Sequence, residues 1–294
     1  MRKRNINILF VLFVLLASTS CNSEKKIYDS DSVKNKTKHN SVAVGKFNKL
    51  IKNGDPDAKY DGAVKYFEAK DYTKALTLFE ELMSTYRGTA KAEEVHYYYA
   101  NCNYFIADYI LAGYQFRTFV KNYPNSKHVE YCAYMNAYCF YLNSPDYSLE
   151  QTDTYLAIKE LQHFTVQYHR SEKIPECNDI LDKLRAKLEL KSYESSMLYY
   201  NMANYKSAIV AFANHIKDFP DTKYEEELKF LTIKSYYLLA INSIESKKQE
   251  RFKGAIDSYI KFVDAFPKSR YIKDAENIYS NSLQSIEKYN KPTS

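Results

Sequence analysis

Residues that break regular structure are scarce in this sequence. Its 294 residues include only 6 glycines and 7 prolines, and tryptophan is absent. Apolar residues make up 45% of the chain, which is too many for a disordered protein, and a turn-rich all-β fold would need more glycine and proline. Tyrosine, with 30 copies, is unusually frequent. The composition therefore favours long helices.

Motifs for catalysis and for nucleotide or metal binding are also missing. The sequence has no G-x-S-x-G, no glycine-rich phosphate loop and no dinucleotide fingerprint. Its six histidines do not pair with Glu or Cys at an established metal spacing. We expect a protein that is not an enzyme and that uses no metal or other cofactor. The enzymatic alternative is a helical scaffold that cleaves glycans with one catalytic Glu, although no separate catalytic domain is evident.

No long block of like charge occurs either. The chain has 42 basic and 36 acidic residues, a formal net charge of +6, and three of the basic residues lie at positions 2–4. Lys and Glu are interspersed along the rest, which is typical of a solvated mixed surface. Nucleic-acid binding is therefore not expected.

The N-terminus has the pattern of an export signal. Basic residues precede an apolar run over residues 6–17, and small residues then lead to Cys21. The run is shorter than the ~20 apolar residues that cross a bilayer, which disfavours the alternative of a membrane-spanning anchor. The pattern resembles a lipoprotein signal, which implies that residues 1–20 are removed and that Cys21 carries a covalent lipid. Asn22 resembles the outer-membrane sorting signal of many lipoproteins.

A tether and one folded domain are expected after the cysteine. Residues 21–54 are mostly polar with little periodicity, which predicts a flexible tether. A strong helix start follows, because Asp55 can cap, Pro56 needs no donor and Asp57 places an acid in the first turn. We therefore place a single helical domain at residues 55–290.

Five copies of one pattern predict repeated second helices. Each copy has a small residue, core positions at +4 and +7, an aromatic at +11 and a terminator at +12, followed two residues later by Ser or Thr. The hydroxyl residues are suited to cap the next helix, and Thr222 with Glu225 predicts a capping box. The small residues are Ala75, Ala112, Ala157, Ala208 and Ala255, and the hydroxyl residues are Thr89, Ser126, Ser171, Thr222 and Ser269.

The first helices carry a second repetition, an aromatic pair seven residues apart. Seven residues are nearly two turns, so each pair lies on one helix face. Two interpretations remain open: the pairs line a groove, or they pack between adjacent first helices. The pairs are Tyr60/Phe67, Tyr97/Tyr104, Tyr134/Tyr141, Tyr193/Tyr200 and Phe230/Tyr237.

Three segments depart from the repeat. A polar insertion lies at about 143–153, where it either carries specificity or acts as a spacer. A charged helical segment occupies 174–191, and residues 271–289 predict a capping helix with a polar outer face.

Four cysteines follow Cys21, an even number that would permit two disulfides. Cys132 and Cys139 lie two helical turns apart, ~10 Å by rise alone, which is too far for a disulfide. We expect Cys102, Cys132, Cys139 and Cys177 to be buried free thiols.

The helix pattern is that of tetratricopeptide (TPR) proteins, an all-α solenoid of about five helical hairpins with a C-terminal capping helix. The stretch 184–227, with Cys21 and an insertion in the third unit, resembles the BamD (ComL) family. The resemblance implies an outer-membrane lipoprotein that faces the periplasm, lacks catalytic activity and serves the machinery that assembles β-barrel proteins.

The resemblance also implies two kinds of partner. N-terminal repeats would bind the C-terminal segment of an unfolded barrel client, and C-terminal repeats would dock the periplasmic domains of the barrel insertase. Ring contacts with aromatic strand ends add ~0.5–1.5 kcal/mol each. The alternative is a lipoprotein TPR adaptor for another envelope process, such as cell-wall synthesis or glycan capture. The groove candidates are Tyr60, Phe67, Tyr97, Tyr104, Tyr134 and Tyr141.

Overall fold

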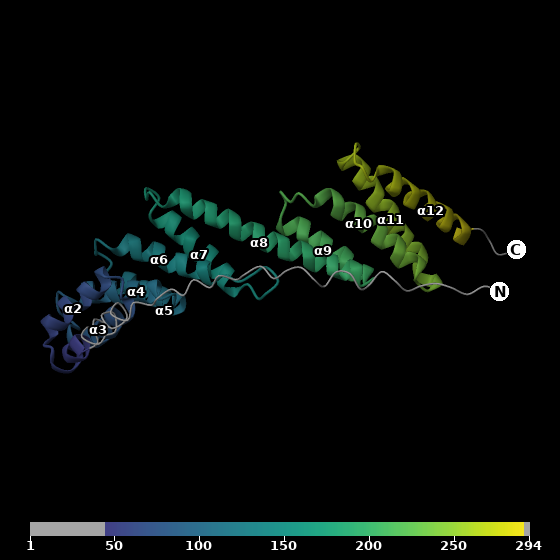
Figure 1. Cartoon of the computed structure of the whole chain (residues 1–294). Helices are drawn as coiled ribbons and strands as arrows, with labels where there is room; N and C mark the ends of the chain where they lie inside the picture. The colour runs from purple at the N-terminus through teal and green to yellow at the C-terminus, as the bar shows by residue number, and fades with distance from the viewer. Residues whose placement is uncertain (1–44, 291–294) are drawn as a thin grey trace, which may run out of the picture. The chain divides into compact units, whose positions relative to one another are not determined.

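The computed structural model describes residues 45–290 and divides the chain into two units, Met1–Asp55 and Pro56–Ser294 (Figure 1). The described part of the first unit is a short helix over residues 45–53. The predicted signal, Cys21 and most of the predicted tether lie outside the described residues. Within residues 45–290, no helix has the length and apolar character needed to span a bilayer.

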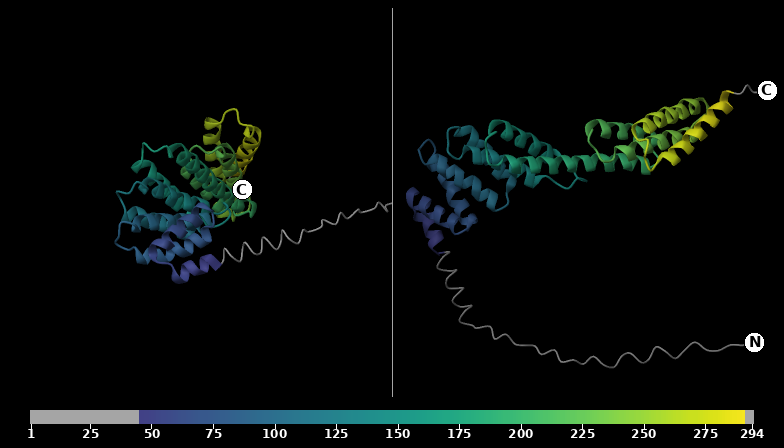
Figure 2. Two further views of the ribbon diagram at one scale, coloured as in Figure 1. Left: turned by 60° about the vertical axis from the view of Figure 1, so that its left-hand side comes forward. Right: turned by 90° about the horizontal axis from the view of Figure 1, so that it is seen from above.

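The described part of the second unit consists of helices joined by short connections, without strands. Each helix packs on its neighbours in the chain, and in Figure 2 it runs back alongside the helix before it. The prediction of an all-α, TPR-like repeat of helix pairs is confirmed. The helices, labelled as in Figure 1, are α2 (Pro56–Glu68), α3 (Tyr72–Thr85), α4 (Ala92–Phe105), α5 (Tyr109–Asn122), α6 (Val129–Asn143), α7 (Thr152–Gln167), α8 (Ile174–Asn201), α9 (Tyr205–Asp218), α10 (Glu225–Ile241), α11 (Glu245–Ala265) and α12 (Ile272–Asn290).

The predicted hydroxyl residues do open the next first helix. The hydroxyls of Ser126, Ser171, Thr222 and Ser269 each accept the backbone N–H two residues further on, at 3.0 to 3.2 Å. In the first repeat the pattern differs, because the Thr89 hydroxyl donates to the carbonyl of Tyr86. These contacts satisfy N–H groups that the helix itself leaves unpaired.

The predicted capping box at Thr222 and Glu225 is not formed. In a capping box, the Glu225 carboxylate would accept a hydrogen bond from the backbone N–H of Thr222. That N–H instead donates to the carbonyl of Phe219. The Glu225 carboxylate instead pairs with Lys229 one turn along α10, at 2.6 Å. The turn before α10 therefore occupies the N–H of Thr222, and the Glu225 side chain pairs with a lysine instead.

Three turns within helix pairs share a feature that the repeat pattern did not reveal. Each has a residue with positive φ, namely Lys70, Ala107 and Ala203. The next residue is Asp71, Asp108 or Asn204, whose side chain accepts an N–H in the first turn of the second helix. In the sequence, an Asp or Asn four residues before the repeat alanine could have identified these helix caps.

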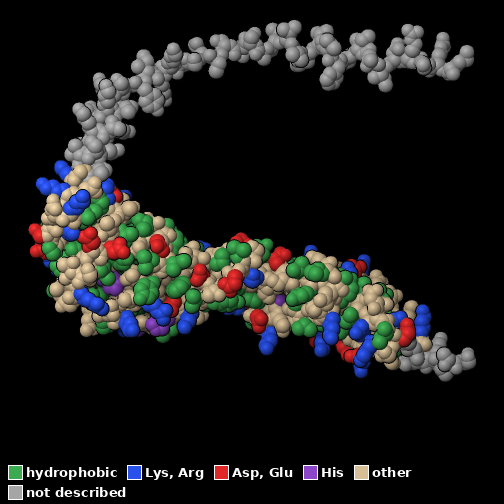
Figure 3. All heavy atoms as spheres, turned by 90° about the horizontal axis from the view of Figure 1, so that it is seen from below, with side chains coloured by type: hydrophobic (Ala, Val, Ile, Leu, Met, Phe, Trp, Pro, Cys, Tyr) green, Lys and Arg blue, Asp and Glu red, His purple; other side chains and the backbone are tan. Residues whose placement is uncertain are grey.

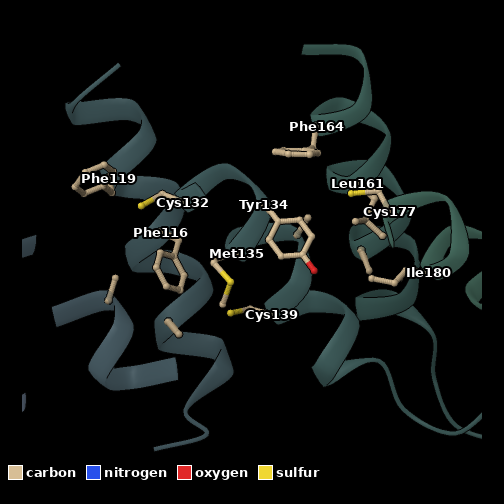
Figure 4. Close-up of a cluster of buried hydrophobic side chains, with 14 of the residues drawn as sticks. Phe116, Phe119, Cys132, Tyr134, Met135, Cys139, Leu161, Phe164, Cys177 and Ile180 are labelled. Atoms are coloured by element: carbon tan, nitrogen blue, oxygen red, sulfur yellow. The ribbon is translucent and has the colours of Figure 1, made fainter. Parts of the chain in front are cut away.

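The repeat alanines lie at the centre of the core. All five are fully buried, which lets paired helices approach closely. One core cluster draws on α4 to α8, and Figure 4 shows Tyr134 within it, pointing from α6 toward the side of Cys177 and Ile180. The four described cysteines are buried and free.

Helix α8 fuses the charged segment with the first helix of the fourth repeat into one continuous element of 28 residues. Its N-terminal half joins the cluster of α4 to α7 through Leu184, whereas Tyr193 packs on the cluster of α9 to α12. Between these points, Lys187 and Lys191 bond to the insertion, which forms the loop 144–151. The insertion thus braces the middle of α8.

Candidate functional site

The first member of each aromatic pair contacts the residue that precedes the next first helix. Tyr97 stacks on His128 with ring centroids 4.1 Å apart, and Tyr193 stacks on Tyr224 at 3.9 Å. Phe230 stacks in the same way on Tyr271, at 4.5 Å. We call this relationship, which joins one first helix to the next, the ring–cap contact.

Lysine takes the place of the second ring in two repeats. The Lys91 ammonium lies 5.1 Å from the Tyr60 ring centre, and the Lys173 ammonium lies 4.9 Å from that of Tyr134. Both are cation–π contacts, which attract a positive charge to the ring face. The ring–cap contact therefore recurs in all five repeats with changing chemistry.

The lysines of these contacts also hold nearby carboxylates. Lys91 donates to Asp57 at 2.6 Å, and this bond keeps the pKa of the Asp57 carboxyl below its usual range. Lys173 donates to Glu176 at 2.9 Å and, followed by the Tyr134 hydroxyl, lowers the pKa of that carboxyl. Burial raises the pKa of Tyr134, so its hydroxyl stays a donor.

Burial of the first members favours the packing interpretation for these positions. Tyr60 and Tyr97 are half-buried, and Tyr134 exposes only 4% of its surface. Each ring is covered on one face by its cap residue, as the previous contacts show. The ring face that the cap residue covers is therefore closed to a ligand.

The second members of the first three pairs belong to a continuous row of rings that runs from α2 to α6, which we call the aromatic ladder. Phe67 contacts Phe105 at 5.8 Å between centroids, and Phe105 in turn stacks on Tyr72 at 4.4 Å. Tyr104 continues the row to Tyr138 at 6.5 Å. The ladder consists of Phe67, Tyr72, Tyr104, Phe105, Tyr138 and Tyr141.

The ladder brings together three of the six predicted groove residues and adds three that the pairs did not include. Phe67, Tyr104 and Tyr141 were predicted, whereas Tyr72, Phe105 and Tyr138 were not members of the predicted pairs. Phe105 is the most accessible member, with 45% of its surface exposed. Its position directly after Tyr104 was the signal that could have identified it.

The ladder is suited to stacking and hydrogen bonding. Burial raises the pKa of Tyr104 and Tyr138, so both hydroxyls remain protonated donors at neutral pH. Aromatic rings prefer edge-to-face or offset partners, and a ladder offers both to an incoming aromatic side chain. Among residues 45–290, no group of His, Cys, Asp and Glu is arranged to hold a metal ion.

The fold and the ladder define a TPR-like helical-repeat scaffold that carries a row of aromatic rings along α2, α3, α4 and α6. The sequence profile of the YfiO family, described as outer membrane lipoprotein, matches residues 52–252, more than half of the chain. The chain therefore belongs to the YfiO (BamD) family of outer membrane lipoproteins.

A relative and two solved structures are similar to the chain. The relative, from Aquifex aeolicus (strain VF5), carries the name "Putative outer membrane protein assembly factor BamD"; it is 23% identical over 249 residues, which are 78% of this chain and 81% of that protein. The structure of the TPR2AB domain of yeast Sti1 aligns with 80% of this chain and 85% of its own, at 12% identity and a TM-score of 0.38. The P58(IPK) TPR domain covers 83% and 69%, at 14% identity and a TM-score of 0.38.

Proposed function

We propose that this chain is a non-catalytic scaffold for the assembly of outer-membrane β-barrel proteins, anchored by a lipid on Cys21 and facing the periplasm. Membership of the outer membrane lipoprotein family carries the proposal. The name of the Aquifex relative, an assembly factor that aligns over most of both chains, supports the assembly role.

The N-terminal repeats are the proposed site for the C-terminal segment of an unfolded client. The aromatic ladder supports this assignment, because Phe105 is exposed and the rings around it are half-buried and rigidly packed. Rigid aromatic surfaces bind with little loss of side-chain entropy. In this proposal Tyr60, Tyr97 and Tyr134 position the ladder, while Phe67, Tyr104 and Tyr141 contact the client.

The C-terminal repeats are the proposed site for the insertase. Exposed apolar side chains support this role, since Leu198 and Met202 at the end of α8 expose 58% and 69% of their surfaces and Val210 on α9 exposes 57%. Hydrophobic side chains also reach the surface among mixed charges on the face shown in Figure 3. Apolar groups rimmed by polar ones are typical of protein interfaces.

Crosslinking in native membranes tests the assembly role. The lipidated protein should recover an outer-membrane barrel that has periplasmic polypeptide-transport domains. Recovery of cell-wall enzymes or glycan-binding proteins without that barrel would instead support the alternative of an adaptor for another envelope process. A Cys21→Ala variant, which should leave the membrane fraction, shows whether the lipid anchors the chain.

Peptide binding tests the client site separately. We expect Tyr104→Ala with Phe105→Ala to weaken binding of a client C-terminal peptide by about tenfold, since two ring contacts of ~0.5–1.5 kcal/mol are lost. Tyr199→Ala is the matched control, because Tyr199 is 43% exposed on α8 and lies outside both the ladder and the cavity described below. Equal affinities for all three proteins, with unchanged circular dichroism, would refute a client site on the ladder.

A further inference from the structure

A cavity of about 360 Å³ lies on the second helices, away from the aromatic ladder. Its walls come from α5 and α7, and α6 closes it from behind. This volume falls at the lower end of the range of ligand pockets, about 300–1,000 Å³. Neither the ring–cap contacts nor the ladder uses its lining residues.

The rim of the cavity is positively charged. Arg117 and Lys121 project from α5 and Lys159 from α7, all three exposed. Among residues 45–290, no carboxylate lies within ion-pair distance of these three cations. The carboxylate in the lining, Glu160, already accepts the side-chain N–H of Asn136 at 2.9 Å. The rim therefore attracts an anion, and Arg117 can bind a carboxylate through two parallel bonds.

A buried amide lies at the back of the same cavity. Asn136 is only 5% exposed, and its carbonyl oxygen Oδ1 is buried without a hydrogen-bond partner in the described part of the chain. An unpaired buried acceptor is costly, so this oxygen is suited to accept an N–H from a ligand. A simple anion offers no such donor, whereas a peptide does.

Apolar groups complete the lining. Val120 and Phe164 also line the cavity, and Phe164 is almost fully buried. One helical turn before the rim on each wall stands an exposed tyrosine, Tyr114 on α5 and Tyr155 on α7, with 63% and 61% of their surfaces exposed. Such rings can pack against side chains that flank a carboxylate.

From these features we infer that the cavity between α5 and α7 is a docking site for an acidic peptide segment of a partner protein. A carboxylate binds to Arg117, Lys121 and Lys159, and a backbone N–H of the same segment donates to Asn136 Oδ1. An adjacent apolar side chain packs between Tyr114 and Tyr155. The cavity shares α6 with the aromatic ladder, but none of its lining residues belongs to the ladder, so it is a separate site from the proposed client site.

Fluorescence anisotropy on the full mature chain tests the inference. The probe is a fluorescein-labelled, C-terminally amidated peptide rich in Asp around one Phe, and its control carries Asn in place of each Asp. A third peptide with a free C-terminal carboxylate shows whether side-chain or terminal carboxylates supply the anion. We expect the acidic probe to bind about tenfold more tightly than the Asn control, and added salt to weaken it.

Two charge-matched double variants locate the binding. Arg117→Gln with Lys159→Gln should weaken binding of the acidic probe by about tenfold, because charge-assisted hydrogen bonds are lost. Lys206→Gln with Lys217→Gln removes the same charge from exposed positions on α9, outside the cavity, and should change the affinity less than about twofold. Asn136→Leu keeps the rim charge and should also weaken binding.

Three results would overturn the inference. The two double variants could lose affinity equally, or the acidic and Asn probes could bind alike. Inorganic phosphate or phosphatidylglycerol vesicles could also displace the probe as effectively as unlabelled acidic peptide, which would make the cavity a general anion site. Circular dichroism of each variant separates loss of binding from loss of fold.

Discussion

The ring of Tyr97 stacks on the imidazole of His128, with centroids 4.1 Å apart and planes inclined by 23°. His128 immediately precedes α6, so the contact fixes the start of one first helix against the face of the preceding one. The other four repeats make the same contact with lysine or tyrosine. The repeat therefore conserves a position in space rather than a residue type.

His128→Ala should destabilise the protein by about 0.5–1.5 kcal/mol, the usual contribution of an aromatic pair beyond burial. Urea unfolding at pH 7.5 measures the change. His169→Ala is the control, because His169 is an exposed residue just after α7. If both variants unfolded at the same urea concentration, the ring–cap contact would contribute nothing to stability.

The repeat could be predicted from sequence because its determinants are local. Ala112 and Phe116 mark one face of α5 through helical spacing alone, and Ser126 marks the next turn through its own hydroxyl. The partner of Tyr97 could not be predicted, because His128 lies 31 positions away and its counterparts differ chemically. Phe105 likewise belongs to the ladder through its contacts with Phe67 on α2 and Tyr72 on α3, which spacing within α4 does not encode.

The cavity between α5 and α7 shows the same limit. Arg117 and Lys159 are ordinary surface cations in their own helices, and only packing places them around Asn136. The insertion is a further case, since its polar composition allowed a spacer or a specificity loop, and the structure shows it bonded to α8 through Lys187.

Lys187→Met should free the loop 144–151. Its ammonium donates to the Ser144 hydroxyl at 2.7 Å and to the Pro145 carbonyl at 2.9 Å. A hydrogen bond to a charged group contributes about 1.5–3 kcal/mol to stability. We expect Lys187→Met to lose an amount at the lower end of this range, because Lys187 is only partly buried. Hydrogen exchange should become faster in the loop and in the middle of α8.

Lys183→Met is the control for the loop, because Lys183 is exposed and pairs with Asp179 within α8 at 2.5 Å. Exchange in the loop should stay at the wild-type rate in this variant. Faster exchange in both variants would mean that loss of charge on α8, rather than loss of the loop bonds, loosens the insertion.

Gly254 permits close approach of α11 to α10. A Cβ atom built on it would lie 2.6 Å from two ring atoms of Tyr236. Gly254→Ala should therefore destabilise the protein by about 1–3 kcal/mol through overpacking, although alanine is the better helix former. Gly45→Ala, whose added Cβ meets no atom within 4 Å, should not destabilise it. Thermal unfolding of the two variants tests this prediction. Equal unfolding midpoints for Gly254→Ala and Gly45→Ala would contradict the overpacking argument.

The buried cysteines should resist thiol reagents. Burial raises the pKa of Cys102, Cys132 and Cys139 to about 12 and that of Cys177 to about 11, so little thiolate exists at pH 8. We expect Ellman's reagent to label none of these four rapidly in the folded chain and all four in guanidinium chloride. Rapid labelling without denaturant would show that the core opens locally.

His215 should make stability depend on pH. It occupies a core position that is Phe119 or Phe164 in other repeats, and its two ring nitrogens lie 3.0 Å from the Ser192 hydroxyl and 3.1 Å from that of Thr222. Burial lowers its pKa below the usual 6.5, and the carboxylates of Glu189 and Asp218 act in the opposite direction with a smaller effect.

The sign of the effect follows from proton binding. Between the lowered folded pKa and the ordinary unfolded value near 6.5, the unfolded chain binds the proton more readily than the folded one. The contribution of His215 to the free energy of unfolding is therefore fully present above about pH 6.5, and it declines as the pH falls below that value. His215→Phe removes this group, so the difference in urea midpoint between pH 7.5 and pH 5.5 should shrink. It should not vanish, because burial also lowers the pKa of His96. An unchanged difference would mean that His215 is equally protonated in both states.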